Sequence, residues 1–227
     1  GNRVYDSRKG CNAIIESEND RLVQACATTK IPKGTKVIAK DAFEYVDVTD
    51  FHIPSSVVEI EHGAFFGSGL KGSLVIPANV KRIGERAFSC CYGIDELVVE
   101  EGVETIDDAA FSNCTGLRRA ELPASLKNFG SGLRYSCVFE GCHLLEEIDI
   151  PEENPYYYCY RNAVVEKGTL TVVDGTGLGH CQLHIGLQEY RPKRIASGAF
   201  RWLPYLTAIW LPETLEEIET GAFFDCP

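Results

Sequence analysis

The sequence has no methionine, two tryptophans and fewer basic than acidic residues. Its 22 Lys and Arg against 33 Asp and Glu give a formal net charge of −11 at pH 7. This charge argues against a nucleic-acid-binding protein, which needs a basic face for the phosphates, and against docking on anionic lipid. No apolar run approaches the ~20 residues that span a bilayer. We therefore expect neither nucleic-acid binding nor direct membrane insertion by this segment.

Motifs of catalysis and of secretion are also missing. The chain starts at Gly1 and has no signal peptide, so we expect a trimmed or mature form whose native start and signal segment lie outside this sequence. There is no G-x-S-x-G nucleophile motif. The carboxylates between Asp95 and Asp108 recur without a base beside them, and glycoside hydrolysis would need two that converge in a cleft. We expect no enzyme.

The most informative feature present is an internal repeat. Related units begin at residues 53, 76, 99 and 122, a constant spacing of 23 residues, and an earlier unit begins at Ile31. Two more units follow an interruption, and the last stops mid-unit at Pro227. A unit this short can bury its apolar face only by stacking on its neighbours. One phenylalanine marks every unit: Phe43, Phe65, Phe88, Phe111, Phe139, Phe200 and Phe223.

Each unit predicts a strand, a turn, a second short extended piece and a brief helical turn. The alternation over residues 117–123 is typical of a strand closed by its proline. The stretch 107–114 predicts a short helix that places Phe111 and Cys114 in the core. Like residues should then stack on like residues along the whole array.

The repeat pattern L-x-x-I-x-I-P-x-x-V-x-x-I-x-x-x-A-F-x-x-C resembles the BspA-like leucine-rich repeats. These repeats occur in surface proteins of gut and oral anaerobic bacteria and in some parasitic protists. The resemblance covers roughly residues 31–153 and 187–227. It implies a right-handed α/β leucine-rich-repeat solenoid of short parallel strands with short helical turns, and a role in adhesion and host-protein binding.

Two segments fall outside the repeat pattern. We expect one continuous domain with an N-terminal β-hairpin cap at 1–30, repeats at 31–153, a β-hairpin insertion at 154–186 and repeats at 187–227. In the first hairpin, Ile14 and Ile15 should face Leu22 and Val23. A loop at Glu18–Asn19 would also set Cys11 opposite Cys26, which leaves a disulfide there open.

The ten cysteines have a structural explanation for the most part. Four of them, Cys91, Cys114, Cys142 and Cys226, occupy the same repeat position, which predicts a buried column of small apolar groups. The best metal candidates are His180, Cys181 and His184 with Cys159, but this H-C-x-x-H run lacks a second matching pair. We expect a surface loop there, with no metal and no cofactor.

The repeat register also sorts outward from inward positions on the longer strands. Solenoids bind partners through such extended faces. One predicted outward column holds His52, Val75, Val98, Glu121, Asp149 and Trp210, and a second holds Glu96, Arg119 and Glu147. A separate cluster of Tyr156, Tyr157, Tyr158 and Tyr160 is either an aromatic binding patch or packing against neighbouring repeats.

These observations favour a monomeric, non-enzymatic repeat domain at the cell surface or secreted from the cell, which mediates protein–protein interaction. A host extracellular-matrix or epithelial protein is the expected kind of partner. Two alternatives stay open from the sequence. One is a carbohydrate-binding module that uses Trp210 and the tyrosines, and the other is a spacer without a ligand.

Overall fold

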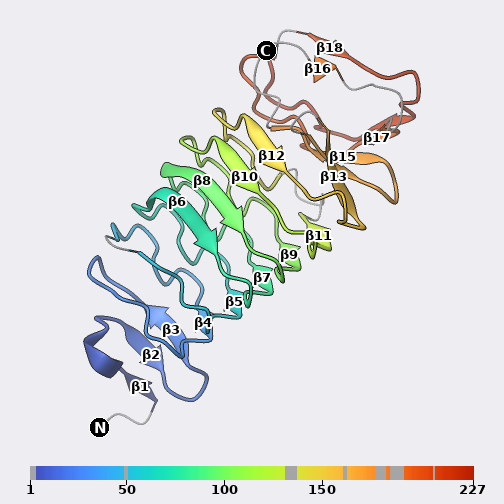
Figure 1. The fold of residues 1–227 in the computed structure, drawn as a ribbon. Helices are drawn as coiled ribbons and strands as arrows, with labels where there is room; N and C mark the ends of the chain where they lie inside the picture. The colour runs from blue at the N-terminus through green and yellow to red at the C-terminus, as the bar shows by residue number, and fades with distance from the viewer. Residues whose placement is uncertain are drawn as a thin grey trace.

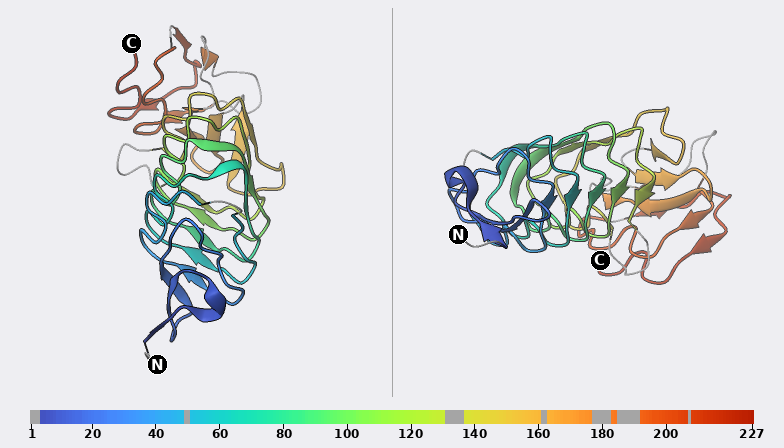
Figure 2. Two further views of the ribbon diagram at one scale, coloured as in Figure 1. Left: turned by 90° about the vertical axis from the view of Figure 1, so that its left-hand side faces the viewer. Right: turned by 90° about the horizontal axis from the view of Figure 1, so that it is seen from below.

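The computed structural model describes residues 4–48, 51–130, 137–160, 163–176, 183–184, 192–206 and 208–227, without the side chains of Lys9, Leu183, His184 and Trp210. Coils of about one repeat each follow one another from the N-terminal end to the C-terminal end (Figure 1). Figure 2 shows the resulting elongated solenoid from two further sides. No helix in these ranges is long and apolar enough to cross a membrane.

The first side of the solenoid is an eight-stranded sheet, here called sheet A. Its first three strands are antiparallel, and every later pairing is parallel. The isoleucines of consecutive coils pair in register and point into the core, as Ile38, Ile60, Ile83 and Ile106 do. In order, its strands are β1 (Tyr5–Asp6), β2 (Ile14–Glu16), β3 (Arg21–Gln24), β4 (Val37–Ile38), β5 (Glu59–Ile60), β7 (Arg82–Ile83), β9 (Thr105–Ile106) and β11 (Asn128–Phe129).

A second, four-stranded parallel sheet, sheet B, forms another side. Residues of its strands alternate between the core and the outside because successive side chains of a strand point to opposite faces. Leu74, Leu97, Ala120 and Ile148 lie in register and are buried. Its strands are β6 (Lys71–Ile76), β8 (Gly93–Val99), β10 (Arg119–Glu121) and β12 (Glu147–Asp149).

Two further sheets lie in the C-terminal third. Sheet C has the order β13 (Tyr157–Tyr160), β14 (Ala163–Glu166), β15 (Thr171–Asp174), β17 (Arg194–Ile195) and β19 (Glu217–Ile218). Strands β14 and β15 form the hairpin expected within the insertion, and β13 adds a third antiparallel strand that we did not expect. Strands β16 (Leu183–His184) and β18 (Ile209–Trp210) pair with each other in parallel.

A column of phenylalanine rings fills the core. Phe65 and Phe88 stack with centroids 4.9 Å apart and ring planes 5° from parallel. Phe88 and Phe111 repeat the arrangement at 5.3 Å and 3°. The side chains of all three are completely buried. The predicted stacking of like on like is therefore confirmed for this column, and Phe200 with Phe223 stacks in the same way in the C-terminal coils.

The expected short helical turns are wrong. In the described part of the chain the only helix is the 3-10 turn η1 (Arg8–Gly10). The stretch 107–114 has left-handed residues at Ala109 (φ 54°) and Asn113 (φ 56°), and right-handed helix cannot pass through them. The backbone N–H groups of these turns also bond across coils: Phe88 N–H donates to the carbonyl oxygen of Ala110 at 2.8 Å. Bonding to the next coil replaces bonding within a helix.

The cysteine column is present, and its thiols have a shared partner. Cys91, Cys114 and Cys142 are completely buried, as predicted. Each thiol donates to the carbonyl oxygen of the core phenylalanine one coil back: Phe65, Phe88 and Phe111, at 3.2, 3.2 and 3.1 Å. Cys226 makes the same bond to Phe200 at 3.0 Å but is only part-buried. The carbonyl oxygens of the first three phenylalanines also accept the backbone N–H three residues further on in their own turns, so each thiol supplies a second donor from the next coil.

The N-terminal hairpin follows the predicted register near its turn and then departs from it. Ile15 pairs with Leu22, but a bulge shifts the next pair to Ile14 and Gln24. Cys11 is buried and Cys26 is exposed, and both are free thiols. The disulfide left open by the sequence is not formed.

The strands β13, β14 and β15 separate two buried clusters. Tyr157 and Val164 pack into the large cluster of the first coils. Val165 and Val172, which point to the opposite face, pack into a smaller cluster with Phe200. Both faces of this small sheet are therefore covered, one by the coils before it and the other by the coils after it.

Candidate protein-binding face

The outward side chains of sheet B form two columns, and seven of these residues are ones that the repeat register placed on this face. Strand pairing places Val75, Val98, Glu121 and Asp149 side by side. It places Ser73, Glu96, Arg119 and Glu147 in the neighbouring column. We call these eight residues the sheet B face. Each lies two positions from the next along its strand, so all of them project away from the core.

The sheet B face is apolar at one end and charged at the other. Val75 has 45% of its surface exposed, and Val98 beside it is half-buried. Arg119 donates from Nη2 to Glu121 at 2.7 Å and lies 3.5 Å from Glu147 through Nε. This guanidinium joins two strands and offsets part of the negative charge of the four carboxylates around it. The remaining charge is negative, and it borders the exposed Val75 and the half-buried Val98.

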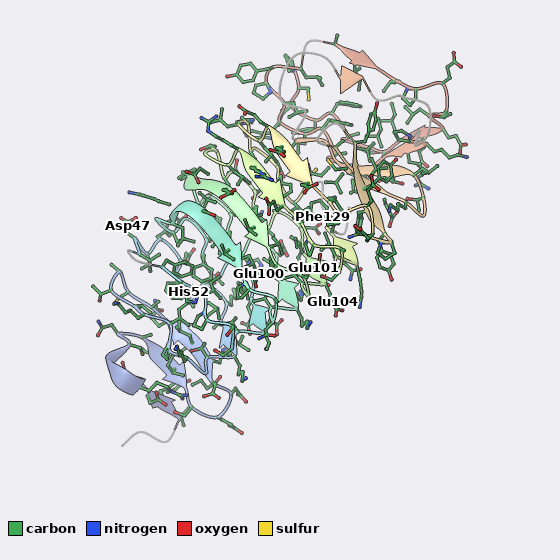
Figure 3. The ribbon with its side chains drawn as sticks, viewed as in Figure 1. Asp47, His52, Glu100, Glu101, Glu104 and Phe129 are labelled. Atoms are coloured by element: carbon green, nitrogen blue, oxygen red, sulfur yellow. The ribbon has the colours of Figure 1, made fainter. Side chains whose placement is uncertain are left out.

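A cavity of about 440 Å³ adjoins the start of this face. Its wall includes Asp47 and Phe51 on one coil and Lys71, Ser73 and Leu74 of β6 on the next. Asp47 and His52 both lie on the coil that precedes β6 (Figure 3). His52 is exposed, as the sequence predicted. No sequence pattern points to the cavity, because residues of two neighbouring coils line it together.

Trp210 does not continue the sheet B face. Its backbone belongs to β18, where it pairs with His184 of β16 in a separate sheet. The side chain of Trp210 lies outside the described part of the structure, as do residues His180 and Cys181 of the candidate metal motif. Among the described residues, no group of three or more His, Cys, Asp or Glu is arranged to hold a metal ion.

The four tyrosines do not form one patch. Tyr157 is 5% exposed and packs against the first coils, whereas Tyr158 and Tyr160 pack against the second cluster. Tyr156 alone is exposed, at 45%. Alternation along β13 sends neighbouring rings to opposite faces, so adjacency in sequence did not produce a shared surface.

The acidic stretch around residue 101 binds coils to each other. Glu100 accepts the backbone N–H of Ala78 at 2.9 Å, and Glu101 accepts that of Ala124 at 2.6 Å. Glu104 pairs with Lys127 of the next coil at 2.7 Å, which lowers the pKa of that carboxyl. Figure 3 shows the three glutamates along one side of the solenoid. Their geometry gives them partners in the scaffold and no common centre for chemistry.

The repeat sequence decides the family. The family model described as "BspA type Leucine rich repeat region" matches the chain in six copies, over residues 36–163 and 183–227. The chain belongs to the BspA-type leucine-rich repeat family. The search of curated proteins gives no match.

Solved structures have a similar fold. The pneumococcal vaccine antigen PcpA is similar with a TM-score of 0.67 and 24% identity, covering 86% of this chain and 46% of its own. A leucine-rich cell surface protein of Faecalibacterium prausnitzii has a TM-score of 0.67 and 23% identity, and the match covers 85% of this chain and 49% of that protein. A leucine-rich repeat protein of Eubacterium ventriosum has a TM-score of 0.52 and 15% identity, and the match covers 94% of this chain and 61% of that protein. This chain thus spans about half the length of the first two.

Proposed function

We propose that this chain is the binding region of a bacterial cell-surface or secreted protein, and that it holds a protein partner on the sheet B face. Membership of the BspA-type family and the similarity to surface proteins support the location. The observation that carries the binding proposal is the exposed Val75 beside Val98, bordered by the carboxylates of Glu121 and Asp149. No part of the face has the convergent groups that catalysis needs.

The chemistry of the face selects the partner. The exposed Val75 and the half-buried Val98 supply apolar area whose burial contributes about 25 cal/mol per Å². The carboxylates favour a basic segment, because complementary charge raises the association rate and excludes acidic competitors. A basic segment of a host extracellular-matrix or epithelial protein fits both requirements. The carbohydrate alternative depended on Trp210 and the tyrosine cluster, and the tyrosines pack against two different buried clusters.

The experiment is interferometry of the 227-residue chain against a panel of extracellular-matrix proteins at two salt concentrations. Binding should weaken with salt, since exposed charges are screened beyond about 10 Å at 0.1 M salt. The triple variant Val75→Ser/Glu121→Gln/Asp149→Gln should bind at least ~10-fold more weakly. Glu59→Gln on sheet A is the matched control and should bind normally.

Two results would contradict the proposal. One is a protein ligand whose affinity is the same for the triple variant and the wild type. The other is the absence of any salt-sensitive protein ligand at concentrations up to about 100 µM, which would favour the spacer alternative.

A further inference from the structure

Strand β6 is the outermost strand of sheet B. The order of the sheet is β12-β10-β8-β6, so β6 pairs with β8 alone (Figure 1). It is a long strand of six residues, Lys71–Ile76. The coil before it, which contains Phe51 and His52, has no strand here among its described residues. One edge of β6 therefore has no neighbouring strand in the described part of the chain.

One missing residue explains why the preceding coil does not extend the sheet. Ile76 follows the core residue Phe65 by eleven positions, whereas Ile53 follows Phe43 by only ten. Because successive strand residues point to opposite faces, a segment one residue shorter cannot keep both of its ends in register with its neighbour. The coil still fills the core, since Phe51 packs its ring edge-on against Phe43 and Phe65.

The open edge of β6 presents main-chain donors and acceptors. Glu100 N–H donates to the carbonyl oxygen of Ile76 at 3.0 Å, so the main-chain groups of Ile76 face β8. The main-chain groups of alternate residues point to opposite sides of a strand, which directs those of Ser73 and Val75 towards the preceding coil. Among the residues that the structure describes, that coil makes no backbone hydrogen bond to either of them.

The cavity of about 440 Å³ lies beside this edge. Phe51 and Leu74 contribute to its apolar lining. Asp47 and Lys71 supply opposite charges where β6 begins, and Asp47 lies against Gly69 just before the strand. The cavity thus combines main-chain hydrogen-bonding groups, an apolar lining and charges of both signs at one end.

The edge of β6 lacks the features that usually prevent another strand from pairing. Proteins protect such edges with proline, with charged side chains or with bulges. From Ser73 to Ile76 the strand has no proline and no charged residue. Its bulge lies between Gly72 and Ser73, at the start of this stretch. Four regular residues therefore remain able to pair.

A single extended segment fits these features better than a second folded copy. Its main chain can bond to Ser73 and Val75, while alternate side chains point to Phe51 and Leu74 or outwards beside the sheet B face. The preceding coil forms the other wall of the cavity, so it obstructs the approach of a whole sheet. One strand needs only about 5 Å between neighbours.

We propose that the edge of β6 binds an extended segment of a partner protein, which adds to the four-stranded sheet B as a further strand. The segment carries β-branched or other apolar residues at alternate positions, which enter the cavity. Its charged residues meet Asp47 and Lys71. The site lies next to the sheet B face but does not depend on it, because it uses main-chain groups rather than the outward side chains.

The first test is amide hydrogen exchange of the 227-residue chain, measured by NMR. The N–H groups of Ser73 and Val75 should exchange at least ~100-fold faster than those of Leu74 and Ile76, which face β8. The probe is the peptide acetyl-Lys-Val-Thr-Val-Thr-Val-Glu-amide, with an expected dissociation constant below about 1 mM. At saturation it should slow exchange at Ser73 and Val75 at least ~10-fold.

Two exchanges at one position separate the main chain from the side chain. Val75→Pro removes the N–H that would bond the peptide, and it should raise the dissociation constant at least ~10-fold. Val75→Thr keeps this N–H and the shape of the side chain, and should bind within about 2-fold of the wild type. Thermal melts verify that both variants fold. A peptide with proline in place of its central valine tests the same pairing without altering the protein, and should bind at least ~10-fold more weakly.

Three results would overturn the proposal. They are Ser73 and Val75 amides as protected as that of Leu74 in the free chain, no binding of the probe up to about 1 mM, and binding that leaves these amides unprotected. Protection that grows with protein concentration alone would assign the edge to a second copy instead. The Glu121→Gln/Asp149→Gln variant should bind the probe normally, so this test and that of the sheet B face can fail separately.

Discussion

The carboxylate of Asp174 in β15 accepts the backbone N–H of Phe139 at 2.9 Å. Phe139 lies in the last coil before strands β13, β14 and β15. The other carboxylate oxygen of Asp174 accepts the N–H of Thr176, also at 2.9 Å. Burial raises the pKa of Asp174 to about 6, against the two N–H bonds that lower it, and the nearby carboxylate of Glu140 adds to the rise. One buried carboxyl thus links the first set of coils to the end of β15.

This carboxyl should make stability depend on pH. Its pKa in the folded protein lies above the usual 3.8, so the folded state binds the proton more tightly than the unfolded state. Protonation of Asp174 therefore adds to the unfolding free energy. This contribution is complete below about pH 4 and is lost as pH rises through about 6. It amounts to roughly 3 kcal/mol for about two pKa units. Urea unfolding at pH 4 to 7 should show that Asp174→Asn removes this component.

The control for this titration is Asp149→Asn, which changes an exposed carboxyl on sheet B. Its unfolding free energy should follow the wild-type pH dependence. If the curves of wild type and Asp174→Asn were parallel from pH 4 to 7, the raised pKa would be wrong.

Truncating a ring of the phenylalanine column should lower the unfolding free energy by a large amount. Phe88 is completely buried between Phe65 and Phe111. Phe88→Ala should lower the unfolding free energy by roughly 3–5 kcal/mol, because it removes apolar burial and leaves a cavity. Tyr92→Ala, at a 60% exposed aromatic, should change it by about 0.5 kcal/mol or less. Denaturant unfolding measures both, and an unchanged midpoint for Phe88→Ala would contradict the core assignment.

The parts of the fold that sequence predicted are those set by the repeat period. A constant 23-residue spacing places Val75 beside Val98 and Phe65 beside Phe88, with no knowledge of the coil's shape. Stacked coils impose this register because identical positions must meet to bury the apolar face. The two outward columns of sheet B followed from the same rule.

The parts that sequence missed depend on contacts between coils or between units. The turn at 107–114 contains residues that suit a helix, but Ala109 and Asn113 adopt left-handed conformations so that the turn bonds to the next coil. The burial of Tyr157 depends on the array end that covers it. The sequence does not distinguish Tyr156 from Tyr157, although Tyr156 is exposed and Tyr157 is buried.

The left-handed turns predict an unusual stabilising substitution. Arg86 has a φ of 55° at the repeat position where Gly63 and Gly198 have φ values of 58° and 74°. A side chain at this φ costs about 1–2 kcal/mol, and glycine recovers most of it despite its greater freedom in the unfolded chain. Arg86→Gly should therefore raise the unfolding free energy by about 0.5–1 kcal/mol.

The neighbouring exchange Glu85→Gly is its control. Glu85 is absent from the positive-φ residues of this turn. Glycine there brings the entropic cost and also removes the carboxylate that lies 3.8 Å from His62 Nδ1, so it should destabilise by at least about 0.5–1 kcal/mol. Urea unfolding of the two variants should move in opposite directions. Equal destabilisation of both would show that Arg86 is not strained.

The cysteines differ in the environment of their thiols. Cys26 is exposed, and hydrogen bonds from the hydroxyls of Thr28 and Thr29 lower its pKa. Burial raises the pKa of Cys91 to about 12. The thiolate is the reactive form, so these two sites should lie at opposite ends of the reactivity range.

Iodoacetamide at pH 7.5 should modify Cys26 at least ~100-fold faster than Cys91 in the folded protein. Peptide mass spectrometry over a time course measures both rates. Thr28→Ala should slow the reaction of Cys26, because its thiolate loses the largest of the stabilising hydrogen bonds. In urea the two cysteines should react at similar rates, which separates the effect of the fold from the effect of local sequence. Equal rates in the folded protein would mean that the cysteine column is open to solvent, which contradicts the thiol–carbonyl bonds that join its coils.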